Sequence, residues 1–199
     1  MDNYIVTISR QFGSMGRTIA AELSKRLEVE YLDRDIVDET AKRMGKPVTT
    51  ISNAEESQSG NFLTRAYPLG NGMAELKDSI FEVQKNIIED FAKAQSGIVV
   101  GRCSDYILRN HPRRLSVYIY ASREERLKNC IERLGMDEKT AKRTIADVDN
   151  AREHYHRTYI PGYKDPFFGR DICIDSSSFG VEGTVDILES IIRKRFIDC

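Results

Sequence analysis

The chain has 199 residues, of which 40% are hydrophobic, and this suffices for one sizeable core, so a single domain over residues 1–199 is expected. Thirty Lys and Arg residues stand against 31 Asp and Glu residues, a formal net charge of −1 with no long run of one sign. This balance argues against the basic footprint of a nucleic-acid-binding protein and the polybasic patch of a membrane-surface protein. An anionic ligand would have to be attracted by arginines gathered locally.

The apolar runs are short, and none approaches the ~20 residues that a membrane span needs. The N-terminus has no basic segment followed by a hydrophobic one, so no signal peptide is expected. Without any C-x-x-C pair, reduced thiols in a cytoplasmic protein are expected rather than a disulfide framework or a zinc site. The four cysteines are Cys103, Cys130, Cys173 and Cys199.

Strand-length apolar runs alternate with segments of helical period along the chain, which is typical of a parallel α/β fold. We expect strands near residues 4–8, 30–33, 97–101, 115–121 and 171–176. We expect helices at 16–27, around 80–92, and from Ser122 to about Leu134, with Gly135 as the stop. The sequence therefore predicts a five-stranded parallel sheet with helices on both faces. Residues 46–72 are the least regular stretch and are either disordered or a functional lid.

A glycine-containing loop follows the first expected strand in the segment ISRQFGSMGRTIA, residues 8–20. Gly16, Arg17 and Thr18 fit the end of the phosphate-binding pattern G-x-x-x-x-G-K-[ST], with Arg17 in the lysine position. The first glycine of the pattern is replaced by Gln11. Because the bare pattern fails at these two positions, a strand–helix turn that binds nothing stays an alternative.

Phosphate binding by such a loop depends on backbone amides and a helix N-terminus rather than on the pattern itself. Glycines permit the tight turn, and Arg17 stays charged and can grip phosphate oxygens as a planar fork. The hydroxyl of Thr18, one turn into the helix, can contact Mg²⁺. The expected phosphate-binding residues are Gly13, Ser14, Met15, Gly16, Arg17 and Thr18.

Charged residues also follow the second and third expected strands. YLDRD places Asp33 and Arg34 where ligands of open α/β sheets bind, although a surface turn that caps the next helix would look the same. GRCSD places Arg102 at another strand end, with Asp105 as the first carboxylate after it. A cap or a surface ion pair is the alternative for Arg102.

A third cluster is DVDNAREHYHR, residues 147–157. Asp149 and Arg152 are three residues apart and share one helix face, so a surface ion pair alone would explain them. Arg157 points about 140° away from Arg152 on a straight helix at ~100° per residue. His154 and His156 face different sides, and no metal site is expected there.

The order of SRQFGSMGRTIAAELSKRLEVEYLDRDIV, IVVGRCSDYIL and VDNAREHYHRTY resembles the cytidylate kinase-like family of P-loop phosphotransferases, from about Tyr4 to Ile192. Relatives carry S-R-x-x-G-S-x-G-R in place of the usual loop, so Gln11 and Arg17 look like family traits. The resemblance implies a three-layer P-loop kinase fold that uses ATP and Mg²⁺ to phosphorylate a nucleoside monophosphate, with CMP or dCMP favoured.

The resemblance also implies residue roles. The implied catalytic residues are Arg17, Arg102, Arg152 and Arg157. The implied acceptor-binding residues are Asp33, Arg34, Arg102, Asp105, Asp149 and Arg152, within and beyond an acceptor-binding insertion at about 34–95. A short lid is expected at about 129–145, with Arg126, Arg133 and Arg143 as candidate phosphate contacts or, equally, solvated side chains.

Two departures from the family pattern leave the function open. Cytidylate kinases carry an L-D-T-G segment after the second strand, and here Arg34 and Asp35 replace its Thr and Gly. They also carry G-R-D after the third strand, and here Cys103 replaces its acid. A kinase for another small molecule, or a nucleotide-binding regulator without turnover, therefore stays possible. The expected partners are small-molecule nucleotides, with no nucleic acid polymer and no membrane, in a monomer or weak homodimer.

Overall fold

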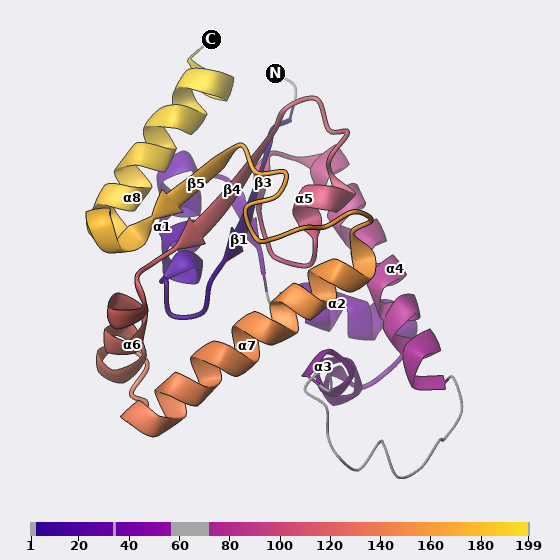
Figure 1. The fold of residues 1–199 in the computed structure, drawn as a ribbon. Helices are drawn as coiled ribbons and strands as arrows, with labels where there is room; N and C mark the ends of the chain where they lie inside the picture. The colour runs from indigo at the N-terminus through magenta and orange to yellow at the C-terminus, as the bar shows by residue number, and fades with distance from the viewer. Residues whose placement is uncertain (1–2, 34, 57–71, 199) are drawn as a thin grey trace.

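A five-stranded parallel sheet in the order β2-β3-β1-β4-β5 forms the centre of the fold (Figure 1). We analysed a computed structural model that describes residues 3–33, 35–56 and 72–198. The strands are β1 (Ile5–Arg10), β2 (Glu30–Leu32), β3 (Gly97–Val100), β4 (Arg114–Tyr120) and β5 (Ile172–Asp175). The predicted fold class is confirmed, and all five strands lie within two residues of their expected bounds.

Helices cover both faces of the sheet. They are α1 (Gly16–Leu27), α2 (Asp35–Met44), α3 (Val48–Glu56), α4 (Gly72–Ala94), α5 (Ser104–Ile107), α6 (Arg123–Glu132), α7 (Glu138–Tyr159) and α8 (Ser176–Ile192), followed by the short π-helix η2 (Arg193–Ile197). Of the helices in the described residues, none is long and apolar enough to cross a membrane.

The strands read as continuous apolar runs because each face of the sheet is buried under helices. Val6 and Ile8 of β1 belong to one cluster with residues of α1 and α8, including Leu23 and Leu188. Ile5, on the opposite face of β1, belongs to a second cluster with residues of α2 and α4. Both layers therefore hold the central strand β1, whose carboxyl end leads into the glycine-containing loop.

The irregular stretch 46–72 contains a helix that the sequence did not suggest. Its polar composition hides α3, whose Ile51 and Ala54 are buried against Val37 of α2 and Ile80 of α4. Two buried side chains are enough to dock a short helix in a tertiary setting, although they give only a weak periodic signal. Residues 57–71, most of the remainder of this stretch, lie outside the described residues, as does Arg34, so the choice between disorder and a lid stays untested there.

The second expected lid, 129–145, is the corner between α6 and α7. Ser122 begins α6 by accepting a hydrogen bond from the Glu125 amide at 3.2 Å, and Gly135 turns the chain with φ of 69°. Buried Cys130 and Ile145 pack near Phe12 of the glycine-containing loop. From this corner α7 runs back across the carboxyl edge of the sheet (Figure 1).

Replacing Gly97 with alanine should destabilise the fold by about 1–3 kcal/mol, because a Cβ here would lie 2.4 Å from Cζ of Phe91 and 2.9 Å from the carbonyl oxygen of Glu30. The free energy of unfolding in urea measures the effect. An unchanged unfolding midpoint would show that β2, β3 and α4 pack less tightly than described.

Candidate active site

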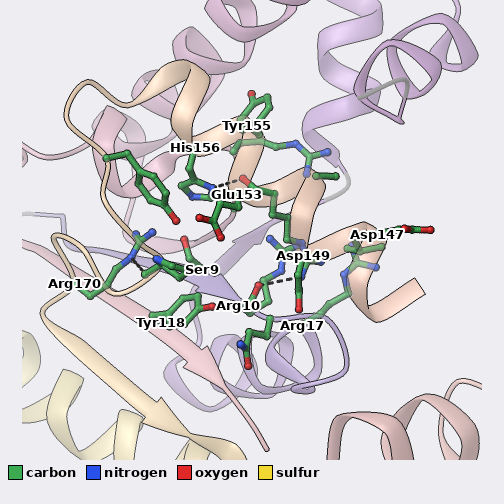
Figure 2. A pocket seen from close by; sticks show the side chains of 18 residues that line it. Ser9, Arg10, Arg17, Tyr118, Asp147, Asp149, Glu153, Tyr155, His156 and Arg170 are labelled. Atoms are coloured by element: carbon green, nitrogen blue, oxygen red, sulfur yellow. Dashed lines mark hydrogen bonds and ion pairs between the residues drawn. The ribbon is translucent and has the colours of Figure 1, made fainter. Parts of the chain in front are cut away.

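A cavity of about 520 Å³ opens at the carboxyl edge of the sheet, beneath α7 (Figure 2). Its walls come from the ends of β1 and β3, from β4, from the start of α1, from α7 and from the loop before β5. Five arginines line it: Arg10, Arg17, Arg102, Arg152 and Arg170. The local concentration of positive charge that the composition required for an anionic ligand is therefore present.

The loop between β1 and α1 is held in place by hydrogen bonds to β4. Gln11, which stands where the P-loop pattern has glycine, accepts a hydrogen bond from the Ala121 amide at 3.2 Å through Oε1. The backbone N–H of Gln11 donates a hydrogen bond to the carbonyl oxygen of Ile119 at 3.0 Å. Oγ of Ser14 donates to the Gln11 carbonyl at 3.0 Å. Where the P-loop pattern has a flexible glycine, Gln11 therefore fixes the loop to the end of β4 by hydrogen bonds.

The start of α1 presents backbone amides without a side-chain cap. Met15, the N-cap, is left-handed with φ of 59° and makes no side-chain cap hydrogen bond. The first helical hydrogen bond runs from Ile19 to the Met15 carbonyl at 2.9 Å, so the amides of Gly16, Arg17 and Thr18 precede it. Such amides, together with the helix dipole, favour a bound anion.

Helix α6 packs directly on this loop. Gly13 has φ of 79°, and a Cβ there would lie 2.8 Å from the carbonyl oxygen of Arg126. Asn129 donates to the Gly13 carbonyl at 3.0 Å, and Arg126 donates to the Phe12 carbonyl at 3.2 Å. Of the three lid arginines, Arg126 is thus bound to the loop, whereas the exposed Arg143 pairs with Asp147 at 3.3 Å.

Asp149 connects α7 to the same loop. Its Oδ1 accepts a hydrogen bond from the Phe12 amide at 2.8 Å, and its Oδ2 accepts one from Arg126. Arg152 lies 3.8 Å from Oδ1, so the two residues form the ion pair that their spacing allowed, in a partly buried setting. Asp149 borders the cavity, but in this structure its oxygens hold the loop and two arginines together.

Asp33 is buried after β2 and faces the arginines of the loop. Its carboxylate lies 2.5 Å from Nε of Arg17 and 3.8 Å from Nη2 of Arg10, and it accepts a hydrogen bond from the Tyr31 hydroxyl at 3.1 Å. The Arg17 side chain remains 49% exposed. Asp33 therefore orients Arg17, the cation of the glycine-containing loop. Its expected acceptor-binding role does not include this contact.

Arg102 and Arg152 both line the cavity although they lie fifty residues apart in the sequence. Arg152 also donates to the carbonyl of Arg10 at 3.0 Å. The backbone is left-handed at three consecutive residues, with φ of 75° at Gly101, 55° at Arg102 and 53° at Cys103. Such strain in non-glycine residues persists only where the surroundings enforce it, and it clusters at functional sites.

Other expected site residues are engaged elsewhere. Asp105 is buried, with its carboxylate 2.5 Å from Arg170. Arg157 is exposed and lies 2.5 Å from Glu153, outside the residues that line the cavity. Asp105 therefore pairs with an arginine that lines the cavity. Arg157 lies away from the cavity, as expected from its angle of about 140° to Arg152 around the helix.

Sequence reasoning did not select Arg10, Tyr118, His156 or Arg170, all of which line the cavity. Arg10 ends a strand directly before the loop, and that position was an available signal. Arg170 and His156 had none, because only the return of α7 and of the loop before β5 brings them to β1. Nδ1 of His156 lies 2.8 Å from the Arg152 carbonyl, so that nitrogen carries the proton.

The crowding of arginines changes their acidity. Burial, followed by the charge of Arg152, lowers the pKa of Arg10 to about 9, although Asp33 opposes the shift. Burial also lowers the pKa of Arg152, and Arg17 and Arg102 add to this effect against Asp149. Like charge therefore adds to burial at Arg10 and Arg152, although Asp147, Asp149 and Glu153 also line the cavity. An anion beside these arginines would relieve their mutual repulsion.

A magnesium site fits this arrangement only together with phosphate. In the described part of the chain no three His, Cys, Asp or Glu residues gather as a ready-made metal site. Thr18 is exposed on the first turn of α1, so its hydroxyl can complete the coordination of an ion that phosphate oxygens bring.

Comparison with known proteins agrees with the geometry. The family model of the cytidylate kinase-like family matches residues 5–178. An uncharacterized protein from Eubacterium ventriosum is similar in structure, with a TM-score of 0.74, 26% identity, and coverage of 97% of this chain and 100% of that one. No curated protein sequence matches the chain.

Shikimate kinases share the fold at low identity. The enzyme from Bacteroides thetaiotaomicron has a TM-score of 0.55 and 10% identity, covering 96% of this chain and 98% of that chain. The one from Acinetobacter baumannii, in complex with shikimate, has a TM-score of 0.53 and 14% identity, covering 98% of this chain and 96% of that chain. The fold is therefore that of P-loop kinases.

The stability of the protein should fall as pH drops below about 6.5, the usual pKa of histidine. Burial lowers the pKa of His156 in the folded state, so the unfolded chain binds a proton first and acid favours unfolding. We expect His156→Asn to reduce this loss between pH 7.5 and 5.5 in urea unfolding, while exposed His154→Asn leaves it unchanged. Equal acid sensitivity of wild type and both variants would contradict the assignment.

Proposed function

Since the chain belongs to the cytidylate kinase-like family, we propose that it transfers the γ-phosphoryl group of ATP to a nucleoside monophosphate, with CMP or dCMP as the favoured acceptor. The observation that supports this most is the cavity in which Arg17, Arg102 and Arg152 meet beside the uncapped start of α1. Phosphoryl transfer needs positioning and positive charge more than it needs covalent chemistry by the protein.

The cavity and the adjoining start of α1 each have a role in this proposal. The amides of Gly16 and Thr18 and the guanidinium of Arg17 bind the phosphates of the donor. Arg102 and Arg152 bind the phosphate of the acceptor. When bound, Mg²⁺ would neutralise phosphate charge, held on the protein side by the Thr18 hydroxyl. The cavity of about 520 Å³ is open to solvent on one side, so parts of the bound nucleotides would extend outside it.

The reaction needs no general base from the protein, because a phosphate monoester is already ionised near neutral pH. An acceptor phosphate oxygen forms a bond to the γ-phosphorus while the bond from that phosphorus to the β,γ-bridging oxygen breaks. The electron pair leaves with ADP, and the acceptor becomes a diphosphate. The arginines stabilise the negative charge that is shared among these oxygens during transfer.

Arg17 in the lysine position and Cys103 in place of an acid favour a second candidate, a nucleotide-binding regulator without turnover. A third keeps the kinase chemistry and changes the acceptor, because a fold does not fix a substrate.

Steady-state ADP production with ATP, Mg²⁺ and a panel of acceptors separates these candidates. We expect turnover with CMP or dCMP well above the ATP hydrolysis seen without an acceptor. Turnover with another acceptor alone would replace the proposed substrate, and ATP binding without any turnover would favour the regulator.

Arg17→Ala should weaken ATP binding and slow transfer by about 10–100-fold, the equivalent of one charge-assisted hydrogen bond, with the fold retained. The half-exposed side chain contributes little to the core, and Asp33 keeps Arg10 as a neighbour. ATP affinity by calorimetry and kcat measure the effect, with Arg17→Lys as the matched variant that restores the usual P-loop cation. Wild-type affinity and turnover in R17A would rule out a phosphate contact by Arg17.

Arg102→Ala and Arg152→Ala should each lower kcat/KM for the acceptor by about 10–100-fold, and the double variant should depart from the sum of the two free-energy changes. The reason is that both side chains would hold one phosphate. Strictly additive losses across this double-mutant cycle would mean that the two arginines bind different groups.

A further inference from the structure

Arg10 lies at the middle of the sheet's carboxyl edge, yet the P-loop pattern gives this position no role. It is the last residue of β1, the strand that lies between β3 and β4. Its side chain is only 10% exposed and still borders the cavity. An arginine that is buried to this extent needs partners for its charge.

Two glycines make the space that Arg10 occupies. A Cβ at Gly16 would lie 2.7 Å from Cβ of Arg10, and a Cβ at Gly101 would lie 2.4 Å from its Nη1. Gly16 is the first residue of α1 and directly precedes Arg17, and Gly101 directly precedes Arg102. The Arg10 side chain therefore passes from the donor side of the cavity to the acceptor side.

The charge around Arg10 is mostly of the same sign. Arg17, Arg102 and Arg152 all act on it electrostatically, and Asp33 is the carboxylate that opposes them, at 3.8 Å. Asp33 also lies 2.5 Å from Arg17, so its single charge is shared. Arg10, Arg17, Arg102 and Arg152, four of the five arginines that line the cavity, repel one another, and a bound anion would offset that repulsion.

We propose that Arg10 is a catalytic residue of this site and that its guanidinium contacts the phosphoryl group during transfer between donor and acceptor. This inference rests on the proposed function for the reaction, but not for the binding of phosphate. The P-loop pattern has a lysine where this chain has Arg17. Arg10, at the buried end of β1, would supply a second cationic contact to the phosphoryl group, while the half-exposed Arg17 binds the donor phosphates. The bonds formed and broken remain those of the transfer described above.

A test independent of turnover is stabilisation by inorganic phosphate. We expect phosphate to raise the melting temperature of the wild type by a few degrees over chloride at equal ionic strength, and to raise that of Arg10→Met by much less. Without phosphate, Arg10→Met should melt no lower than the wild type, because it removes mutual repulsion. Arg109→Met, an exposed arginine outside the cavity lining, is the matched control and should respond as the wild type does.

Kinetics with ATP and the acceptor then separate a transfer role from simple binding. Arg10→Met should lower kcat by at least about 10-fold with smaller changes in either KM, whereas a purely structural role would lower the melting temperature without this pattern. Arg10→Lys keeps a charge in the same space and should retain the fold with intermediate phosphate stabilisation, so the test holds even if the methionine variant unfolds.

The outcomes distinguish this inference from the proposed function. Phosphate stabilisation that depends on Arg10, without turnover of any nucleotide, would support the anion site and refute the proposed reaction. Turnover of CMP that is equal in wild type and Arg10→Met would support the reaction and overturn the role of Arg10. Equal phosphate stabilisation in wild type, Arg10→Met and Arg10→Lys would also overturn it.

Discussion

Mutual repulsion among arginines at the carboxyl edge of the sheet is the constraint on which the rest of this site depends. Arg10, Arg17, Arg102 and Arg152 approach one another closely enough for burial and like charge to lower the pKa of Arg10 and Arg152. The fold tolerates this because its sheet, buried under helices on both faces, supplies stability elsewhere. The packing of helices on both faces of the sheet thus offsets an unfavourable charge distribution at its carboxyl edge, as is common at functional sites.

Two carboxylates distribute the compensation between separate parts of the molecule. Asp33, after β2, lies near Arg10 and Arg17, whereas Asp149 on α7 binds Arg126 and lies near Arg152. Because Asp149 also accepts from the Phe12 amide, the helix that covers the cavity and the loop that would bind phosphate are joined. A ligand that draws an arginine away from Asp149 would therefore act on the loop and on the covering helix α7 together.

Glycines in this site are required by the arginine that they surround. The usual P-loop uses glycine for backbone freedom, but Gly16 and Gly101 here leave room for Arg10, and Gln11 anchors the loop through its side chain. The two departures from the P-loop pattern, Gln11 and Arg17, therefore occur together with a third feature, the buried Arg10. Gln11 anchors this loop and Arg17 stands in the lysine position, and α1 still begins without a side-chain cap next to Arg17, which lines the cavity.

The sequence by itself determined the parallel α/β fold, its five strands, α1 and the position of the glycine-containing loop, because these depend on local periodicity and on the residues next to each strand end. It also indicated that Arg102 and Arg152 could share a site. Only the tertiary structure decided that Asp33 pairs with Arg17, that Asp105 pairs with Arg170 and that Arg157 points elsewhere. Only the tertiary structure brought Arg10 and His156 together at one cavity. The physical reason is that an ion pair between distant segments depends on where helices cross the sheet, and crossing points are set by packing of the whole core rather than by any local pattern.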